Sequence, residues 1–181
     1  MFVLNNKFLE RKFMDNALKL FYYQFHTEQH YFYCHDILEE AWKENPTFSK
    51  NDPVVSLILF ATGCYHYRRH NYIGAKRSFQ RAYKVIAQAA SSQYLGLNIN
   101  YYQKLIVQMI SNIEQQKAFE PIQLPITETM EQQILQDYPN YILTPYVIDD
   151  EYIVHHHIKR DRSEVIQARQ EAIQNNNRLS K

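Results

Sequence analysis

Glycine and proline are scarce in this sequence, which has three glycines and six prolines among 181 residues. Folds built from many strands and tight turns normally use more of both, because glycine reaches backbone angles that other residues avoid and proline fixes turns. The scarcity therefore argues against an all-β fold. A chain of this length can bury the core of one domain and still carry an appendage.

Disulfides, membrane spans and a leader segment are not expected either. Two cysteines, Cys34 and Cys64, are too few for a disulfide framework, so we expect reduced thiols in a cytoplasmic protein. The longest apolar run, residues 57–61, is far too short to cross a bilayer. The N-terminus has no charged region followed by an apolar run, so no signal peptide is expected.

Acidic residues are absent from the middle of the chain. Residues 53–113 carry seven Lys or Arg and no Asp or Glu. Residues 118–158 show the reverse, with seven Asp or Glu and no Lys or Arg. The overall net charge of +1 hides this segregation, which says more about binding partners than the total does.

Apolar residues recur at helical spacing in the first two thirds of the chain, and this periodicity predicts five helices. Their expected ranges are 5–25, 28–43, 53–69, 73–90 and 98–118. Thr27 is the expected N-cap of the second helix, and Asp52 with Pro53 begins the third. Short loops between helices favour antiparallel packing, so residues 1–118 are predicted to form an all-α antiparallel bundle.

Residues 119–181 are predicted to form a separate acidic appendage. Pro121 and Pro125 mark a linker, and Thr127 begins a short helix that ends near residue 137. Residues 146–154, YVIDDEYIV, contain two β-favouring pieces and predict a short hairpin. A last helix is expected over residues 162–175.

The stretch YFYCHDILEEAW, residues 31–42, carries the main candidate site. With about 3.6 residues per turn, one stripe of this helix should face the core. The stripe contains Tyr31, Phe32, His35, Leu38, Glu39 and Trp42. Because a buried charge is costly unless it is paired or ligated, His35 and Glu39 need a partner. His66, on an inner stripe of the third helix, is the expected third member.

Two interpretations of His35, Glu39 and His66 are open. Two histidines and a carboxylate leave an open coordination position on a divalent metal, as in catalytic zinc sites. The H-E-x-x-H pattern of zinc proteases and the paired E-x-x-H of di-iron bundles are absent, however. The favoured interpretation is a structural hydrogen-bond network that fixes helix register, with no cofactor, because no fourth ligand can be named.

Other histidines and the cysteine beside His35 are given structural interpretations. Cys34 points about 100° away from His35 on a helix, so His35 is not expected to activate it. His26 and His30 lie near a helix start and are expected to be exposed. The triplet at residues 155–157 is interpreted as solvated chain after a strand.

Arg77, Arg81 and Lys84 fall on the side of the fourth helix opposite to its apolar residues. This basic stripe suits nucleic-acid phosphate, an acidic protein partner, or the chain's own acidic tail, within one copy or in a dimer. Nucleic acid is the weakest of these, because no recognition motif accompanies the stripe and the pI is about 7.8.

Two blocks of the sequence resemble domain-of-unknown-function family 309, a small all-helical family. Its signature is an aromatic pair followed by H-E-x-x-E-x-x-W. Here that signature is Tyr31-Phe32 followed by His35-Asp36-Ile37-Leu38-Glu39-Glu40-Ala41-Trp42. A second block is Tyr65-His66, Arg69-His70-Asn71 and Gly74-Ala75.

The resemblance implies an all-helical fold over about residues 25–90 and no particular activity. Its motif residues here are His35, Asp36, Glu39, Trp42 and His66. Asp36 stands where the family has Glu, and His70 stands where the family has a turn glycine. A positive φ at His70 is therefore expected to cost strain.

Two functions follow from these patterns. The leading expectation is a protein-interaction or structural module. The alternative is a metal-assisted hydrolase, or a small-molecule site, built on His35, Glu39 and His66.

Overall fold

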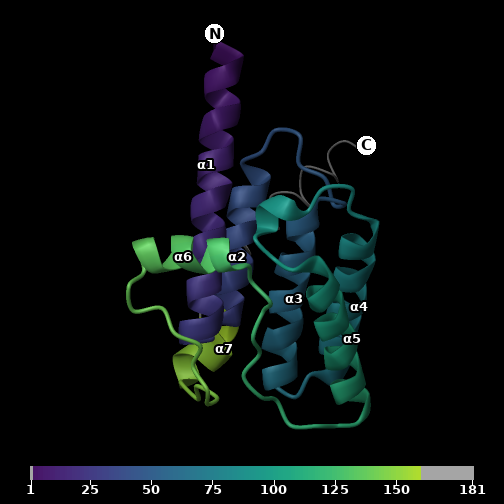
Figure 1. Cartoon of the computed structure of the whole chain (residues 1–181). Helices are drawn as coiled ribbons and strands as arrows, with labels where there is room; N and C mark the ends of the chain where they lie inside the picture. Colours follow the sequence, from purple (N-terminus) through teal and green to yellow (C-terminus); the bar gives the residue numbers. More distant parts are fainter. Residues whose placement is uncertain (1, 160–181) are drawn as a thin grey trace, which may run out of the picture.

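The computed structural model describes the backbone of residues 2–159 and the side chains of residues 12–155. The elements of this part are α1 (Phe2–Tyr23), the π-helical turn η1 (Gln24–Glu28), α2 (Tyr31–Lys43), α3 (Pro53–Arg68), α4 (Tyr72–Gln88), the 3₁₀ turn η2 (Gln93–Leu95), α5 (Ile99–Glu114), α6 (Glu128–Asp137) and α7 (Glu151–Lys159). The predicted all-α class is confirmed (Figure 1). Over the described ranges, no helix has the length and apolar character needed to traverse a bilayer.

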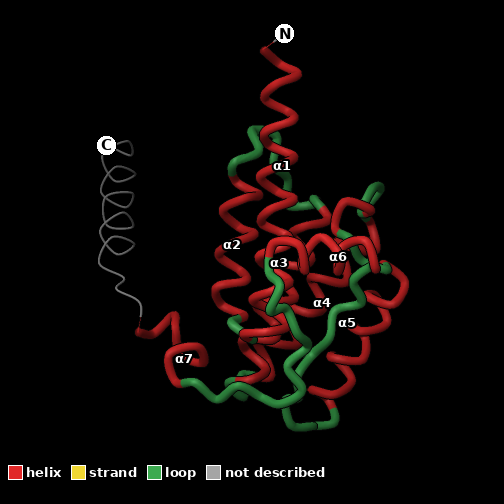
Figure 2. The backbone as a smooth tube through the Cα atoms, turned by 60° about the vertical axis from the view of Figure 1, so that its left-hand side comes forward, coloured by secondary structure: helices red, strands yellow, loops and turns green. Residues whose placement is uncertain are grey.

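Helices α1 to α5 form the bundle, with α3 packed between α2 and α4 (Figures 1 and 2). Neighbouring helices run antiparallel: Phe32 at the start of α2 contacts Tyr65 near the end of α3, with ring centroids 5.4 Å apart. The ring of Phe60 on α3 lies 5.1 Å from Phe79 of α4 and 5.4 Å from Tyr102 of α5. Burial of each such side chain contributes about 1.5–3 kcal/mol.

The central helix α3 is apolar on nearly all sides, as its sequence predicts, and its glycine is a packing residue. A Cβ at Gly63 would lie 2.6 Å from the ring of Phe79. A larger residue at this position would therefore push α4 away from α3. Gly63 therefore marks the close approach of α4 to α3.

The predicted helix starts are partly correct. Thr127 caps α6, because its side chain accepts the Met130 amide. Asp52 holds the N-cap position of α3, but its carboxylate accepts hydrogen bonds from Ser49 and Trp42 instead. Thr27 does not cap α2, which begins at Tyr31 after the η1 turn.

The acidic appendage contains no hairpin in its described part, so that prediction is wrong. Residues 141–150 have no helix or strand, and α7 begins at Glu151. The side chain of Asp150 accepts the Ile153 amide at 2.9 Å and so caps the new helix. The helix expected over 162–175 lies outside the described residues. Division of the chain at residue 118 stays a prediction, although Ile122 and Leu124 share the bundle's core.

Candidate functional site

The buried side of α2 differs from the predicted stripe. It consists of Tyr31, Cys34, Ile37, Leu38 and Ala41. His35, Glu39 and Trp42 are only partly buried, so the predicted helix phase is wrong for these three residues. The indole N–H of Trp42 donates to the Asp52 carboxylate at 2.9 Å. Trp42 thus ties the end of α2 to the start of α3 from the side of the bundle.

His35, Asp36 and Glu39 form one cluster on the partly exposed flank of α2. One ligand atom from each lies within 4.8 Å of the others. Nδ1 of His35 is 3.0 Å from Oδ1 of Asp36, and Glu39 pairs with Lys43 at 3.0 Å. A nitrogen and two carboxylates are a donor set that suits zinc and other divalent cations.

His66 does not belong to this cluster. It is partly buried near the end of α3, and its Nδ1 lies 3.1 Å from the Asn71 side-chain amide. Burial, and then the charge of Arg69, lower the pKa of His66. The structure replaces His66 with Asp36 as the third member beside His35 and Glu39.

Cys34 and Cys64 are free and completely buried. Burial raises the pKa of both thiols well above the usual value. A buried thiol held in its neutral form is a poor nucleophile. The expectation that Cys34 is not activated by His35 agrees with this geometry.

The basic stripe of α4 is exposed. Arg77, Arg81 and Lys84 all face solvent, and none pairs with a carboxylate among the described residues. Lys76, one residue away, behaves differently and pairs with Glu114 of α5 at 2.8 Å. The stripe is therefore a set of cations whose charge no neighbouring acid offsets.

An open groove of about 530 Å³ is lined by residues of α5 together with Tyr83 of α4, the neighbour of Lys84 in the sequence. Its lining includes Tyr83 of α4 and Lys104 and Val107 of α5. The ammonium of Lys104 sits 5.5 Å from the ring centroid of Tyr101, which is exposed. The basic face, defined as Arg77, Arg81, Lys84 and Lys104 with Tyr83, Tyr101 and Val107, thus combines charge with aromatic surface. The contribution of α5 to this face could have been found from the spacing of Tyr101, Lys104 and Val107, which are three residues apart along one side of the helix.

The chain's own acidic segment lies elsewhere on the bundle. Residues 138–150, here named the strap, cross the junction of α1, η1 and α2. Thr27 both donates to the Ile142 carbonyl and accepts its amide. Gln29 donates to the Tyr146 carbonyl at 2.7 Å and accepts the Ile148 amide at 3.1 Å. For the described part of the tail, docking on Arg77, Arg81 and Lys84 within one copy is therefore wrong.

His26 and His30 are buried, contrary to expectation. His26 contacts both the linker and the strap through Leu124 and Tyr141. Beneath the same junction, the buried guanidinium of Arg68 donates to the Gln29 carbonyl at 2.8 Å and lies 4.8 Å from the Tyr31 ring centroid. Burial lowers the pKa of Arg68. No periodic pattern in the sequence indicated these contacts.

Comparison with known proteins gives the family. The family described as Domain of unknown function (DUF309) matches residues 18–78. The chain is also 32% identical over 156 residues to the uncharacterized protein YpuF of Bacillus subtilis (strain 168). That alignment covers 83% of this chain and 90% of YpuF. The chain belongs to the DUF309 family. No solved structure matches it.

The DUF309 match divides the candidate sites. It spans α2 and α3 and therefore includes the cluster of His35, Asp36 and Glu39. Lys84, Lys104 and the strap lie beyond the matched residues. Of the basic-face residues, only Arg77 lies within the range that matches the family.

Proposed function

We propose that this DUF309 protein is a binding module that takes up an acidic segment of a protein partner on its basic face. The observation that supports it most is the exposed stripe of Arg77, Arg81 and Lys84 in a stretch without a single acidic residue. The chain's own acidic strap lies on another surface, so the stripe is available to a partner. The two free, buried cysteines suit a reducing compartment, so we place the protein in the cytoplasm.

The chemistry of the face favours a peptide that contains both carboxylates and aromatic or apolar side chains. Exposed ion pairs contribute little each, about 0–1 kcal/mol, so charge alone would steer a partner without holding it. Tyr83, Tyr101 and Val107 add the apolar surface that holding requires. The two arginines add specificity for carboxylates, because a planar guanidinium binds a carboxylate through two parallel hydrogen bonds.

Fluorescence anisotropy with a short labelled peptide of Asp, Glu and Tyr tests this proposal. Binding should weaken at least about tenfold in an Arg77→Glu, Arg81→Glu, Lys84→Glu variant, because each site loses an attraction and gains a repulsion. The matched control carries the same charge change at exposed lysines elsewhere, as Lys12→Glu, Lys50→Glu and Lys117→Glu. Equal weakening in both variants would show that the change in net charge, and not the position of the stripe, causes the loss of binding. Stronger binding of a single-stranded oligonucleotide than of the peptide would overturn the choice of a protein partner.

A second candidate function rests on the convergence of His35, Asp36 and Glu39 within 4.8 Å. We propose that this cluster holds a divalent cation and supports metal-assisted hydrolysis or small-molecule binding there. All three ligands come from one turn of α2, and this leaves coordination positions open for water and substrate. The cluster must first give up the contact between His35 and Asp36 and the pair between Glu39 and Lys43.

Zinc titration of protein without a histidine tag tests this second candidate. A ligand that binds only the folded state must raise the melting temperature. A rise that His35→Ala and Glu39→Gln both abolish, and that replacing His155 does not, would support the cluster. No rise, or a rise lost only with residues 155–157, would contradict it.

A further inference from the structure

The strap presents an acidic and aromatic surface that matches the basic face. We define the outer strap as six of its exposed residues: Ile142, Leu143, Tyr146, Val147, Asp149 and Asp150. Tyr146 is 67% exposed and Ile142 is 57% exposed, so this short loop presents a large aromatic and a large apolar side chain to solvent. No Lys or Arg occurs between residues 118 and 158, so the surface carries only negative charge.

The strap is fixed by its backbone, which is why its side chains point outward. Gln29 binds the Tyr146 carbonyl and the Ile148 amide, and the Thr144 amide donates to the His26 carbonyl at 3.1 Å. The side chains of Tyr141 and Thr144 are the buried ones of this segment. A segment held in this way loses little further conformational entropy on binding, because its shape is set in the free protein.

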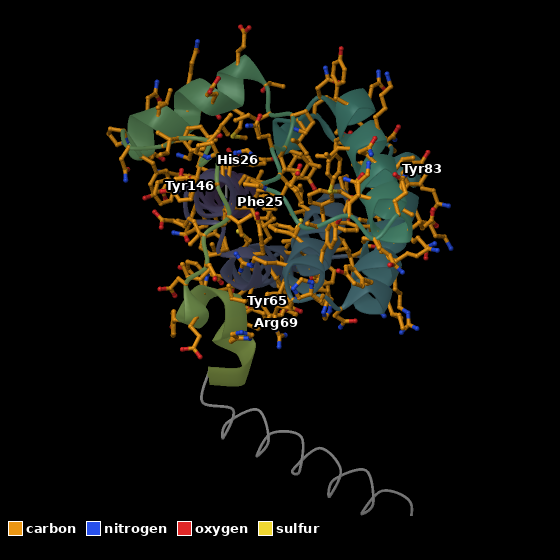
Figure 3. All side chains as sticks on the ribbon, turned by 90° about the horizontal axis from the view of Figure 1, so that it is seen from below. Phe25, His26, Tyr65, Arg69, Tyr83 and Tyr146 are labelled. Atoms are coloured by element: carbon orange, nitrogen blue, oxygen red, sulfur yellow. The ribbon has the colours of Figure 1, made fainter. Side chains whose placement is uncertain are left out.

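The outer strap and the basic face lie on opposite sides of the molecule. Figure 3 shows Tyr146 of the strap and Tyr83 of the basic face at opposite edges of the same view. Figure 1 likewise places the segment between α6 and α7 on one side and helices α4 and α5 on the other. The two surfaces therefore cannot meet within one copy of the chain.

We infer that the acidic segment bound by the basic face is the outer strap of a second copy of this chain. This inference rests on the function proposed above and names its partner. Asp149 and Asp150 of one copy face Arg77, Arg81 and Lys84 of the next, and Tyr146 and Val147 pack at the groove along α5. Because two different surfaces meet, the contact is head-to-tail and each end of a dimer keeps one unused surface.

Sedimentation velocity of the full chain over a range of concentrations tests this inference. The mean mass should rise with concentration at low salt and fall as salt is added, because exposed charges are screened. A face variant (Arg77→Ser, Arg81→Ser, Lys84→Ser) and a strap variant (Tyr146→Ser, Asp149→Asn) should each remain monomeric when alone. All five positions are exposed, so both variants are expected to fold, and circular dichroism checks this.

Mixing the two variants decides between head-to-tail and symmetric association. The face variant keeps an intact strap and the strap variant keeps an intact face, so one native contact can form. The mixture should reach the mass of a dimer and stop there. If the wild type associates but the mixture stays monomeric, the head-to-tail contact is overturned.

The peptide experiment keeps this inference separate from the proposed function. A wild type that is monomeric at every concentration but binds the acidic peptide would overturn self-association and leave the proposed function standing. A wild type that neither associates nor binds the peptide would overturn both.

Discussion

The backbone amide of Leu124 donates a hydrogen bond to Nε2 of His26 over 2.8 Å. Because Nε2 accepts, Nδ1 carries the ring proton and donates to the Tyr141 hydroxyl, 2.6 Å away. A second proton on the ring would break the contact with Leu124. Burial lowers the pKa of His26 to about 3. Neutral His26 therefore joins the linker and the strap to the η1 turn.

Stability should depend on pH through His26. Its folded pKa lies below the ordinary value of 6.5, so the unfolded chain takes up the proton first as the pH falls. The stabilisation is complete above about pH 6.5 and is lost as the pH falls towards about 3. Between about pH 7.5 and about pH 5.5, His26 should account for a loss of about 1.4 kcal/mol. Urea unfolding of the wild type and of His26→Gln measures this, and an equal loss in both proteins would contradict the neutral assignment.

Gln29→Ala should loosen the strap before it unfolds the bundle. The substitution removes the side-chain hydrogen bonds to the Tyr146 carbonyl and the Ile148 amide, both partly buried, and each typically contributes about 0.5–1.5 kcal/mol. Hydrogen exchange should speed up over residues 144–150 and stay unchanged in α3. The control is Gln80→Ala, an exposed position on α4. Unchanged exchange in the strap would show that Gln29 does not hold it.

Trp42 separates packing from hydrogen bonding at the end of α2. Its ring packs edge-on against Phe48 at 4.9 Å, and its N–H reaches Asp52. Trp42→Phe keeps a ring and removes the donor, and should cost about 1–2 kcal/mol. Trp42→Ala should cost about 2–3 kcal/mol, below a full core truncation because the residue is partly exposed. Denaturant melts give both values. A Trp42→Phe variant as stable as the wild type would show that the hydrogen bond to Asp52 does not stabilise the protein.

His70→Gly should stabilise the turn between α3 and α4. His70 has φ of 59°, in the left-handed region where a side chain costs about 1–2 kcal/mol. Part of the gain is offset by the flexibility of glycine in the unfolded chain, so we expect up to about 1 kcal/mol. Gln80→Gly, at an exposed position inside α4, should instead destabilise by about 1 kcal/mol. A loss of stability in both variants would refute strain at His70.

Helix positions were predictable from the sequence, but the rotation of α2 was not. Residues 31–42 carry aromatic or apolar side chains on several sides, so the pattern fits two phases about one residue apart. The structure selects the phase in which small Cys34 and Ala41 are buried beside Leu38. Cys34 lies against α1, where its thiol donates to the Phe21 carbonyl. Sequence periodicity does not show which neighbour the face of a helix will meet. Asp36 was therefore missed as the third member of the cluster.

The strap shows a different limit. Opposite charges suggested the stripe of Arg77, Arg81 and Lys84, in the same copy or in a second one, as a docking surface for the tail. Its position is decided instead by hydrogen bonds from Thr27 and Gln29 to strap backbone, together with burial of Tyr141. Contacts of that kind depend on main-chain groups, which every residue has, so composition cannot reveal them. The start of α7 could have been predicted from the sequence, because Asp150 followed by Glu151 is a helix-start signal.

Mapping the acidic peptide onto the protein by amide chemical shifts tests the central claim most directly. Titration of the Asp, Glu and Tyr peptide into isotopically labelled protein at low salt should shift amides along α4 and α5, around Arg81, Lys84 and Lys104. The amides of α2 around His35 should stay in place, and added salt should reverse the shifts. Shifts centred on His35 and Glu39, or no shifts at all, would contradict the basic face as the binding surface.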